Sequence, residues 1–276
     1  MESIGGQALI EGVLMRNKNL IGIAVRKSNG KIKTEKQEFN LFSKFKKIIF
    51  LRGIFVLIET IYLGTKALIF SANEAADEKE DKVSKKEIFF SILFSIIFGL
   101  GFFVVLPLFL TKLIVNEGIL FNIVDGIIRV GVFVLYIIGI SFMRDIKRVF
   151  QYHGAEHMAV HCYENKKTLT VNNCRNYSTV HVRCGTNFLF IVLILSIIVF
   201  SFITSEEWYL KFLSRLTLIP VIASLSYEFL KLSSKFENSL IIRFLTKPGL
   251  LLQKITTKKP DDKQIEVAIS ALKLVI

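Results

Sequence analysis

The hydrophobic positions of this 276-residue chain are gathered into long runs, and charged segments separate the runs. A helix needs about 17 to 25 apolar residues to cross the hydrocarbon core of a bilayer. Four runs approach or reach that length, at residues 88–115, 123–143, 187–204 and 209–230. The pattern therefore predicts a predominantly α-helical integral membrane protein with four transmembrane helices.

A fifth apolar stretch, residues 41–72, is interrupted by Arg52, Glu59 and Lys66 at intervals of seven residues. At about 100° per residue, these side chains share one face of a helix. Charges in mid-span are costly in lipid. We therefore expect an in-plane or re-entrant helix, or one facing a bundle interior, joined to the first span by a charged linker that ends at residue 87. A solvated stripe on an amphipathic helix is the alternative interpretation.

The two ends of the chain have other patterns. Residues 1–40 contain QALIEGVLM, IGIAVRK and KIKTEKQEF, separated by the turn-like RNKN and SNG. These predict a β meander of two or three strands. Residues 232–276 predict amphipathic helices, the first basic and suited to a membrane surface, the second capped by Asp261 or Asp262.

Charge predicts the orientation in the membrane. The chain carries 36 Lys and Arg against 23 Asp and Glu. The Lys and Arg residues are concentrated in residues 1–87, 144–186 and 231–276. Cytoplasmic loops are enriched in Lys and Arg, so we expect both termini and the 144–186 segment to be cytoplasmic. A fifth span at 41–72 would move the basic N-terminus outside. We attribute the net charge of +13 to contact with membrane lipid and expect no nucleic-acid partner.

All four histidines of the chain lie between His153 and His181. The segment 153-HGAEHMAVHCYE-164 has no proline and follows a predicted span directly, so we expect a helix. On that helix three imidazoles and the carboxylates of Glu156 and Glu164 share an arc of about 140°. The face is ionisable, whereas a packing stripe would be apolar.

His153, Glu156 and His157 have the H-x-x-E-H order of inverted zinc peptidases. Two imidazoles four residues apart on a helix can bind one Zn²⁺, and Glu156 can polarise a bound water. One helix rarely supplies three ligands to a tetrahedral ion, because positions i and i+8 lie about 12 Å apart along its axis. The sequence thus predicts a divalent-metal site, most readily zinc, with Glu156 as general base.

The third metal ligand is left open by the sequence. Residues 169–188 predict a strand and loops that bring further ligand-type side chains to the same cytoplasmic segment. The candidates are His161, Glu164, His181 and Cys184, with Arg183 beside them. A hydrogen-bonded network without metal and a solvated helix face are the alternatives.

Three functions fit this pattern. The first is a metal-dependent hydrolase that acts on a peptide or lipid-linked substrate at the inner leaflet. The second is a non-enzymatic adaptor for a membrane-protein complex, using the basic surface and the Arg52, Glu59 and Lys66 stripe. The third is a transporter or channel, which with four spans would need a homo-oligomer.

Several long blocks of the sequence carry a resemblance to a known family. They are GGQALIEGVLMR, RGIFVLIETIYLGTKALIFSANEAADE, YHGAEHMAVHCYE, LTVNNCRNYSTVHVRCGTNFL and KPGLLLQKITTKKPDDKQIEVAISAL. The chain resembles the YqhQ-like family of bacterial multipass membrane proteins, which are labelled as predicted metal-dependent enzymes. The resemblance supports a metal site in a protein of the bacterial cytoplasmic membrane, and it implies no particular reaction, substrate or catalytic residue. The first block adds Gln7, Glu11 and Arg16 as functional candidates, and we expect Glu11 and Arg16 to meet the histidine loop at the cytoplasmic membrane face. Turn glycines and a surface ion pair are the alternative.

Overall fold

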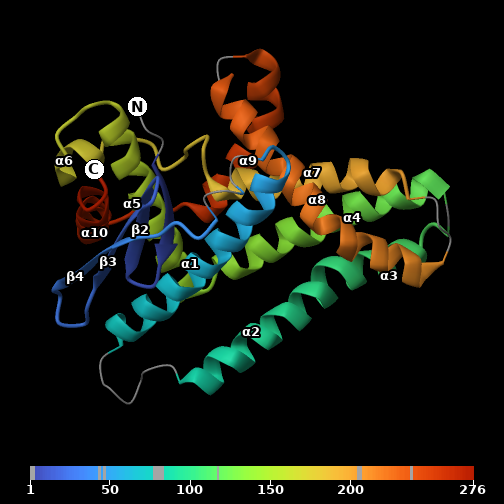
Figure 1. Ribbon diagram of the computed structural model, residues 1–276, viewed down its shortest axis with the longest axis horizontal. Coiled ribbons are helices and arrows are strands. Elements are labelled where there is room, and N and C mark those ends of the chain that lie inside the picture. The colour runs from blue at the N-terminus through green and yellow to red at the C-terminus, as the bar shows by residue number, and fades with distance from the viewer. Residues whose placement is uncertain are drawn as a thin grey trace.

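A computed structural model describes residues 4–42, 45, 48–76, 84–116, 118–203, 207–236 and 239–276. It has two parts along its long axis (Figure 1). One part joins a β-sheet to helices from the middle and the end of the chain, and the other is a bundle of apolar helices. Residues 77–83 of the charged linker expected before residue 87 lie outside the described residues.

The N-terminal meander has four strands: β1 Gly5–Leu9, β2 Gly12–Asn17, β3 Leu20–Arg26 and β4 Ile32–Glu38. They pair antiparallel in sequence order. An antiparallel meander is confirmed, but it has four strands where two or three were expected. QALIEGVLM forms two of them, because the chain turns between Leu9 and Gly12 with Glu11 at a φ of 51°. Few non-glycine residues adopt positive φ, so a glutamate within an alternating apolar and polar pattern does not predict a turn.

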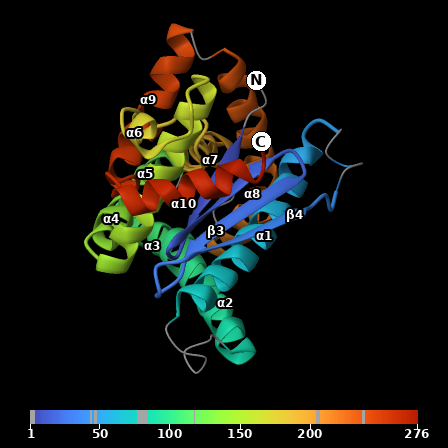
Figure 2. The ribbon, with the colours of Figure 1, turned by 90° about the vertical axis from the view of Figure 1, so that its left-hand side faces the viewer.

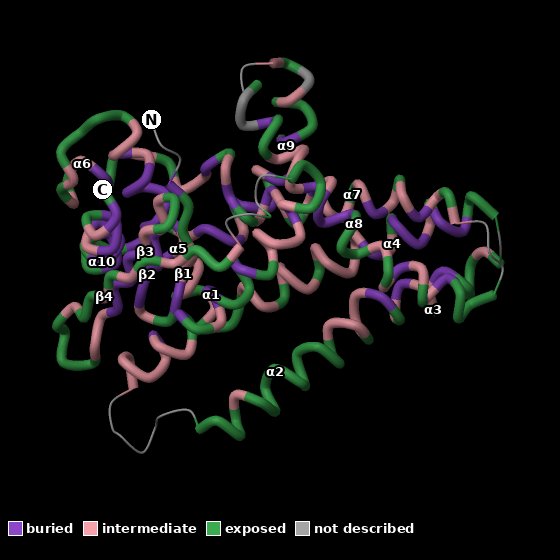
Figure 3. The backbone as a smooth tube through the Cα atoms, in the orientation of Figure 1, coloured by how far each residue is buried: buried purple, intermediate pink, exposed green. Residues whose placement is uncertain are grey.

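Both faces of the sheet are covered by helices. Helices α5 (Arg144–Glu164) and α10 (Asp262–Lys273) pack on one face (Figure 2). Helix α1 (Leu51–Ala75) covers the other face through Leu63 and Ala67. Buried residues are concentrated in this sandwich (Figure 3). Burying each large apolar side chain stabilises the fold by about 1.5–3 kcal/mol.

Among the described residues, four helices are long and apolar enough to cross a membrane. They are α1, the continuous rod Lys85–Lys112, α4 (Gly118–Ser141) and α8 (Trp208–Lys235). The rod consists of α2 (Lys85–Leu100), a π-helical turn η3 (Gly101–Val105) and α3 (Leu106–Lys112). The helix type therefore changes locally between the glycines and the proline, and the rod continues through them.

The four qualifying helices are not the four expected spans. Helix α1 replaces α7 (Gly185–Ser201), which has 17 residues. A helix of that length extends about 26 Å, slightly less than a typical hydrocarbon core. The bundle is nevertheless built from the four expected segments, because η3 and α3 contact α4, α4 contacts α7, and α7 contacts α8.

The segment between α5 and α7 differs from the expected strand and loops. It contains a four-residue helix, α6 (Val171–Cys174), followed by a loop to Cys184, and no strand. Thr170 caps α6 by accepting a hydrogen bond from the Asn173 N–H. A cap of this kind competes with extended pairing. The expected C-terminal helices are present as α9 (Leu240–Thr256) and α10, with Asp261 as the cap of α10.

Candidate metal centre

Helix α5 carries the histidines and is fixed by its opposite face. Tyr152, Ala155, Ala159 and Cys162 are completely buried against the sheet and α10. Gly154 packs so tightly that a Cβ there would lie 2.1 Å from the Lys258 carbonyl oxygen. The helix therefore cannot rotate or slide without breaking its packing, and its histidine face has a fixed direction.

Three ligand-type side chains converge beside this helix. One ligand atom each of His153, His157 and Cys184 lies within 4.8 Å of the other two. His153 Nε2 is 3.2 Å from Cys184 Sγ. Tetrahedral zinc, with Zn–N of about 2.0 Å and Zn–S of about 2.3 Å, places a nitrogen and a sulfur ligand roughly 3.5 Å apart. The spacing suits a shared ion.

Backbone carbonyls fix both imidazoles in one tautomer. His153 Nδ1–H donates to the Thr256 carbonyl at 2.9 Å, and His157 Nδ1–H donates to the Thr179 carbonyl at 2.5 Å. The Nε2 atoms are then left with free lone pairs. Metal-bound histidines are oriented in the same way, by donating the second N–H to a carbonyl or carboxylate.

Cys184 is the N-cap residue of α7, and its sulfur accepts a hydrogen bond from the Thr186 N–H. Burial alone would raise the pKa of the Cys184 thiol, but the nearby His157 imidazole and the hydrogen bonds with Thr186 outweigh it and hold the pKa below its ordinary value. The thiolate is the form that binds metal. Burial also lowers the pKa of His157, which favours the neutral form of the imidazole, the form that coordinates metal.

Glu156 lies next to this group without belonging to it. Its side chain is buried, and Oε2 has no hydrogen-bond partner among the described residues. Burial raises the pKa of Glu156 to about 8. Gly6 of β1 makes room for the carboxylate, since a Cβ at Gly6 would lie 2.6 Å from Glu156 Oε1. A buried carboxyl with a pKa near neutrality is suited to general acid–base chemistry.

A second group joins His161, Glu164 and His181, whose ligand atoms also lie within 4.8 Å of one another. Its polar atoms are already engaged. His181 Nε2–H donates to Glu164 at 3.1 Å, His161 Nε2–H donates to the Val180 carbonyl at 2.9 Å, and Arg183 pairs with Glu164. The adjacent guanidinium disfavours a bound cation. This group is best described as a closed hydrogen-bond network.

The predicted ligand set is therefore divided by the structure. His153, His157 and Cys184 are brought together, whereas His161 and His181 lie in the neighbouring network. The two groups touch, with the rings of His157 and His181 at a centroid distance of 5.8 Å.

The N-terminal candidates contact the histidine helix and α1. Glu11 pairs with Arg148 of α5 and accepts a hydrogen bond from the Tyr152 hydroxyl at 3.0 Å. Arg16 pairs with buried Glu59 of α1 at 2.9 Å. The expected contact with the histidine segment holds for Glu11, whereas Arg16 meets α1. Both interactions join elements of the fold, as the ion-pair alternative described.

The remaining candidates are dispersed. Gln7 packs against α1, where a Cβ at Gly64 would lie 2.4 Å from its Oε1. Arg52 pairs with Glu228 of α8, and Lys66 is exposed. Two members of the Arg52, Glu59 and Lys66 stripe are thus paired within the chain, and Lys66 is the exposed member.

Sequence reasoning missed the groups that orient the imidazoles. The carbonyls of Thr179 and Thr256 belong to the backbone, so no residue type could reveal them. Gln253 is completely buried and binds both backbone groups of His181 at 2.9 Å. A glutamine in an amphipathic helix gives no distinctive signal.

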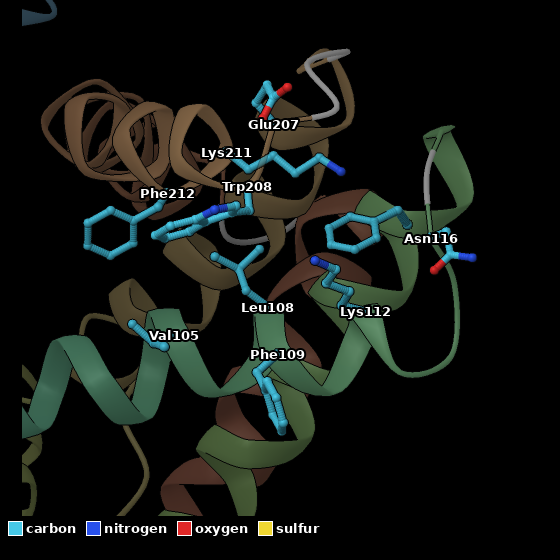
Figure 4. A pocket seen from close by; sticks show the side chains of 10 residues that line it. Val105, Leu108, Phe109, Lys112, Asn116, Glu207, Trp208, Lys211 and Phe212 are labelled. Carbon is cyan, nitrogen blue, oxygen red and sulfur yellow. The ribbon is translucent and has the colours of Figure 1, made fainter.

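The far end of the bundle holds a cavity of about 540 Å³ between the end of α3 and the start of α8 (Figure 4). Apolar side chains and Trp208 line it, with Lys112 and Lys211 at its margin. Helix α4 separates it from the histidines by about 36 Å of helix. Nearby, Asp125 pairs with Arg129 and Arg215 inside the bundle. This polar cluster links α4 to α8 and pairs the charges that lie within these apolar helices.

Comparison with known proteins places this geometry in a family context. Residues 48–276 match the family described as "Protein of unknown function (DUF1385)". The chain is 35% identical over 286 aligned positions to "Uncharacterized protein YqhQ" of Bacillus subtilis (strain 168), covering 97% of this chain and 90% of that protein. No solved structure matches.

Proposed function

We propose that this chain, which belongs to the DUF1385 family of YqhQ-like proteins, is a divalent-metal-dependent hydrolase that acts at the inner leaflet of the bacterial cytoplasmic membrane. The convergence of His153, His157 and Cys184 on one point carries the proposal. Zinc fits this nitrogen and sulfur set best. With three protein ligands, a fourth position is open to water or substrate.

Glu156 is the general base in this proposal. Its buried carboxylate has an oxygen without a partner among the described residues, and it lies one residue from a ligand. A bound divalent ion would lower the pKa of its water to about 7. Glu156 would accept a proton from that water as the oxygen attacks a carbonyl or phosphoryl centre, and would return it to the leaving group.

In the proposed membrane arrangement the metal centre lies at the membrane surface, so we expect a peptide or lipid-linked substrate. The bundle of α2–η3–α3, α4, α7 and α8 spans the bilayer, with both termini cytoplasmic. Helix α1 lies in the interface, because its buried side covers the sheet and its other side exposes Ile58, Ile61 and Tyr62. Cys184 begins α7, so the metal lies where that helix enters the membrane.

Heavy oxygen in the solvent water tests hydrolysis without a known substrate. The purified protein in lipid is incubated in such water with extracted membrane lipids and peptides, beside a Glu156→Gln variant with the same metal content. We expect products labelled with heavy oxygen only in the wild-type reaction, by mass spectrometry. Equal labelling in both reactions would remove the hydrolase proposal and leave the metal centre standing.

A further inference from the structure

Helix α9 has two faces of different character. The outer face is a stripe of exposed side chains at helical spacing, in which apolar and basic residues alternate. The stripe consists of Leu240, Arg243, Phe244, Lys247, Leu251 and Lys254. Leu240 is 81% exposed and Phe244 is 77% exposed. So much exposed apolar surface on one helix indicates that another phase or molecule covers it.

The composition of the outer face selects the occupant. No acidic residue occurs between Leu240 and Thr256, so every charge on the helix is positive. Helices with bulky apolar and cationic side chains lie in the membrane interface, where apolar groups enter the acyl boundary and Lys and Arg meet anionic headgroups. An anionic phospholipid surface matches both features of the stripe.

The inner face of α9 contacts the metal centre. The Thr256 carbonyl, at the end of the helix, accepts the hydrogen bond that orients His153. Gln253 holds the backbone N–H and carbonyl of His181, three residues before Cys184. Gly249 packs on Asn187, in the first turn after Cys184. One rigid helix therefore supports both arms of the ligand group.

The position of α9 connects these two faces. It lies at the junction between the bundle and the sheet domain, beside α7 (Figures 1 and 2). This junction is the interface level in the proposed membrane arrangement. A tilt of α9 would displace the Thr256 carbonyl and the His181 loop in one movement, and would separate His153 from Cys184.

We propose that anionic phospholipids bind the outer face of α9 and hold the helix where its inner face brings His153 and Cys184 into ligand geometry. The metal centre is then complete only on an anionic membrane surface, and lipid composition regulates its affinity for metal. This inference rests on the proposed metal centre and adds its regulation.

Cobalt titration in lipid nanodiscs tests the coupling. The full chain is placed in discs of phosphatidylglycerol or of phosphatidylcholine, and the thiolate-to-cobalt absorption band reports occupancy. We expect at least about fivefold tighter cobalt binding in the anionic discs, the factor that one lysine at an anionic surface can supply. Equal affinities in the two lipids would overturn the inference.

Charge-matched variants locate the effect on α9. Lys247→Gln/Lys254→Gln removes two exposed charges from the outer face, and Lys33→Gln/Lys36→Gln removes two from the exposed strand β4. We expect the first variant to lose most of the lipid dependence and the second to keep it. The same loss in both variants would mean a diffuse charge effect and would contradict a role for α9.

Hydrogen exchange separates failure of this inference from failure of the metal centre. If the protein binds no cobalt in any lipid, the proposed metal centre fails, but amide exchange still reports on α9. We expect slower exchange at residues 179–184 and in α9 in anionic discs. The inference is overturned if amide exchange at these residues is the same in both lipids. It is also overturned if exchange there slows only when an acidic protein co-purifies with the chain and covers α9.

Discussion

Replacing Gly154 by alanine should disturb the metal centre without touching a ligand. The added Cβ would lie 2.1 Å from the Lys258 carbonyl oxygen, so the two backbones must separate by about 0.9 Å to reach even 3.0 Å. The neighbouring hydrogen bond from His153 to the Thr256 carbonyl is 2.9 Å long. A displacement of that size stretches it to about 3.8 Å, beyond hydrogen-bonding distance.

We expect two measurable effects of Gly154→Ala. Overpacking in a well-packed core costs about 1–3 kcal/mol of unfolding free energy, measurable as an earlier unfolding transition. His153 also loses the partner that fixes its tautomer, and loss of such a partner lowers metal affinity by about 10- to 100-fold. Competition with a chromophoric chelator measures the affinity.

Gly131→Ala is the matched control. Gly131 is also an interior helix residue, and a Cβ there would meet no atom within 4 Å among the described residues. Alanine should be neutral or slightly stabilising at this position, since glycine costs about 0.5–1 kcal/mol in a helix. If Gly154→Ala has the same metal affinity and the same unfolding free energy as Gly131→Ala, then α5 does not pack closely on residue 258.

The remaining predictions concern charged groups. Glu156→Gln should keep the metal and abolish hydrolysis. Elemental analysis measures the metal and the heavy-oxygen assay measures hydrolysis. Loss of metal from this variant would show that Glu156 is a ligand. Hydrogen bonds from its partners outweigh burial and lower the pKa of Glu164, so its stabilising contribution is present above the unfolded pKa of about 4.5 and is lost as pH falls below it. Glu164→Gln should thus unfold at a lower temperature than wild type at pH 7, and this difference should shrink as pH falls below 4.5. A difference that stays constant with pH would refute this. Arg16→Met should lower the free energy of unfolding more than Arg16→Met/Glu59→Gln does, because the single change takes a partner from a buried carboxylate. Chemical unfolding measures both variants. If the effects of the two substitutions simply add in the double variant, the pairing is contradicted.

The sequence predicted the elements that depend on local pattern. The runs of the bundle, the histidine helix and the capped C-terminal helix follow from periodicity and capping residues. Apolar periodicity alone could not determine which faces of α1 were buried, because its charged residues find partners far along the chain, such as Arg16 for Glu59. The turn at Glu11 was also missed, since a glutamate at positive φ has no sequence signature.

The site could be predicted only in part, for a geometric reason. His153 and His157 share a helix face, so their spacing is readable from the sequence. Whether Cys184 or His181 joins the two histidines depends on the path of the loop from α6 back to α7. Gln253 of α9 fixes that path by its hydrogen bonds to the His181 backbone. These long-range contacts cannot be obtained from residue spacing.

Zinc content of the purified protein tests the central claim most directly. Elemental analysis of wild type, Cys184→Ser and Cys162→Ser compares the proposed ligand thiol at the N-cap of α7 with a buried thiol on the packed face of α5. We expect about one zinc ion per chain in wild type and Cys162→Ser, and strongly reduced zinc in Cys184→Ser. A wild-type protein that takes up no divalent metal, or a Cys184→Ser variant that holds as much as wild type, would contradict the account.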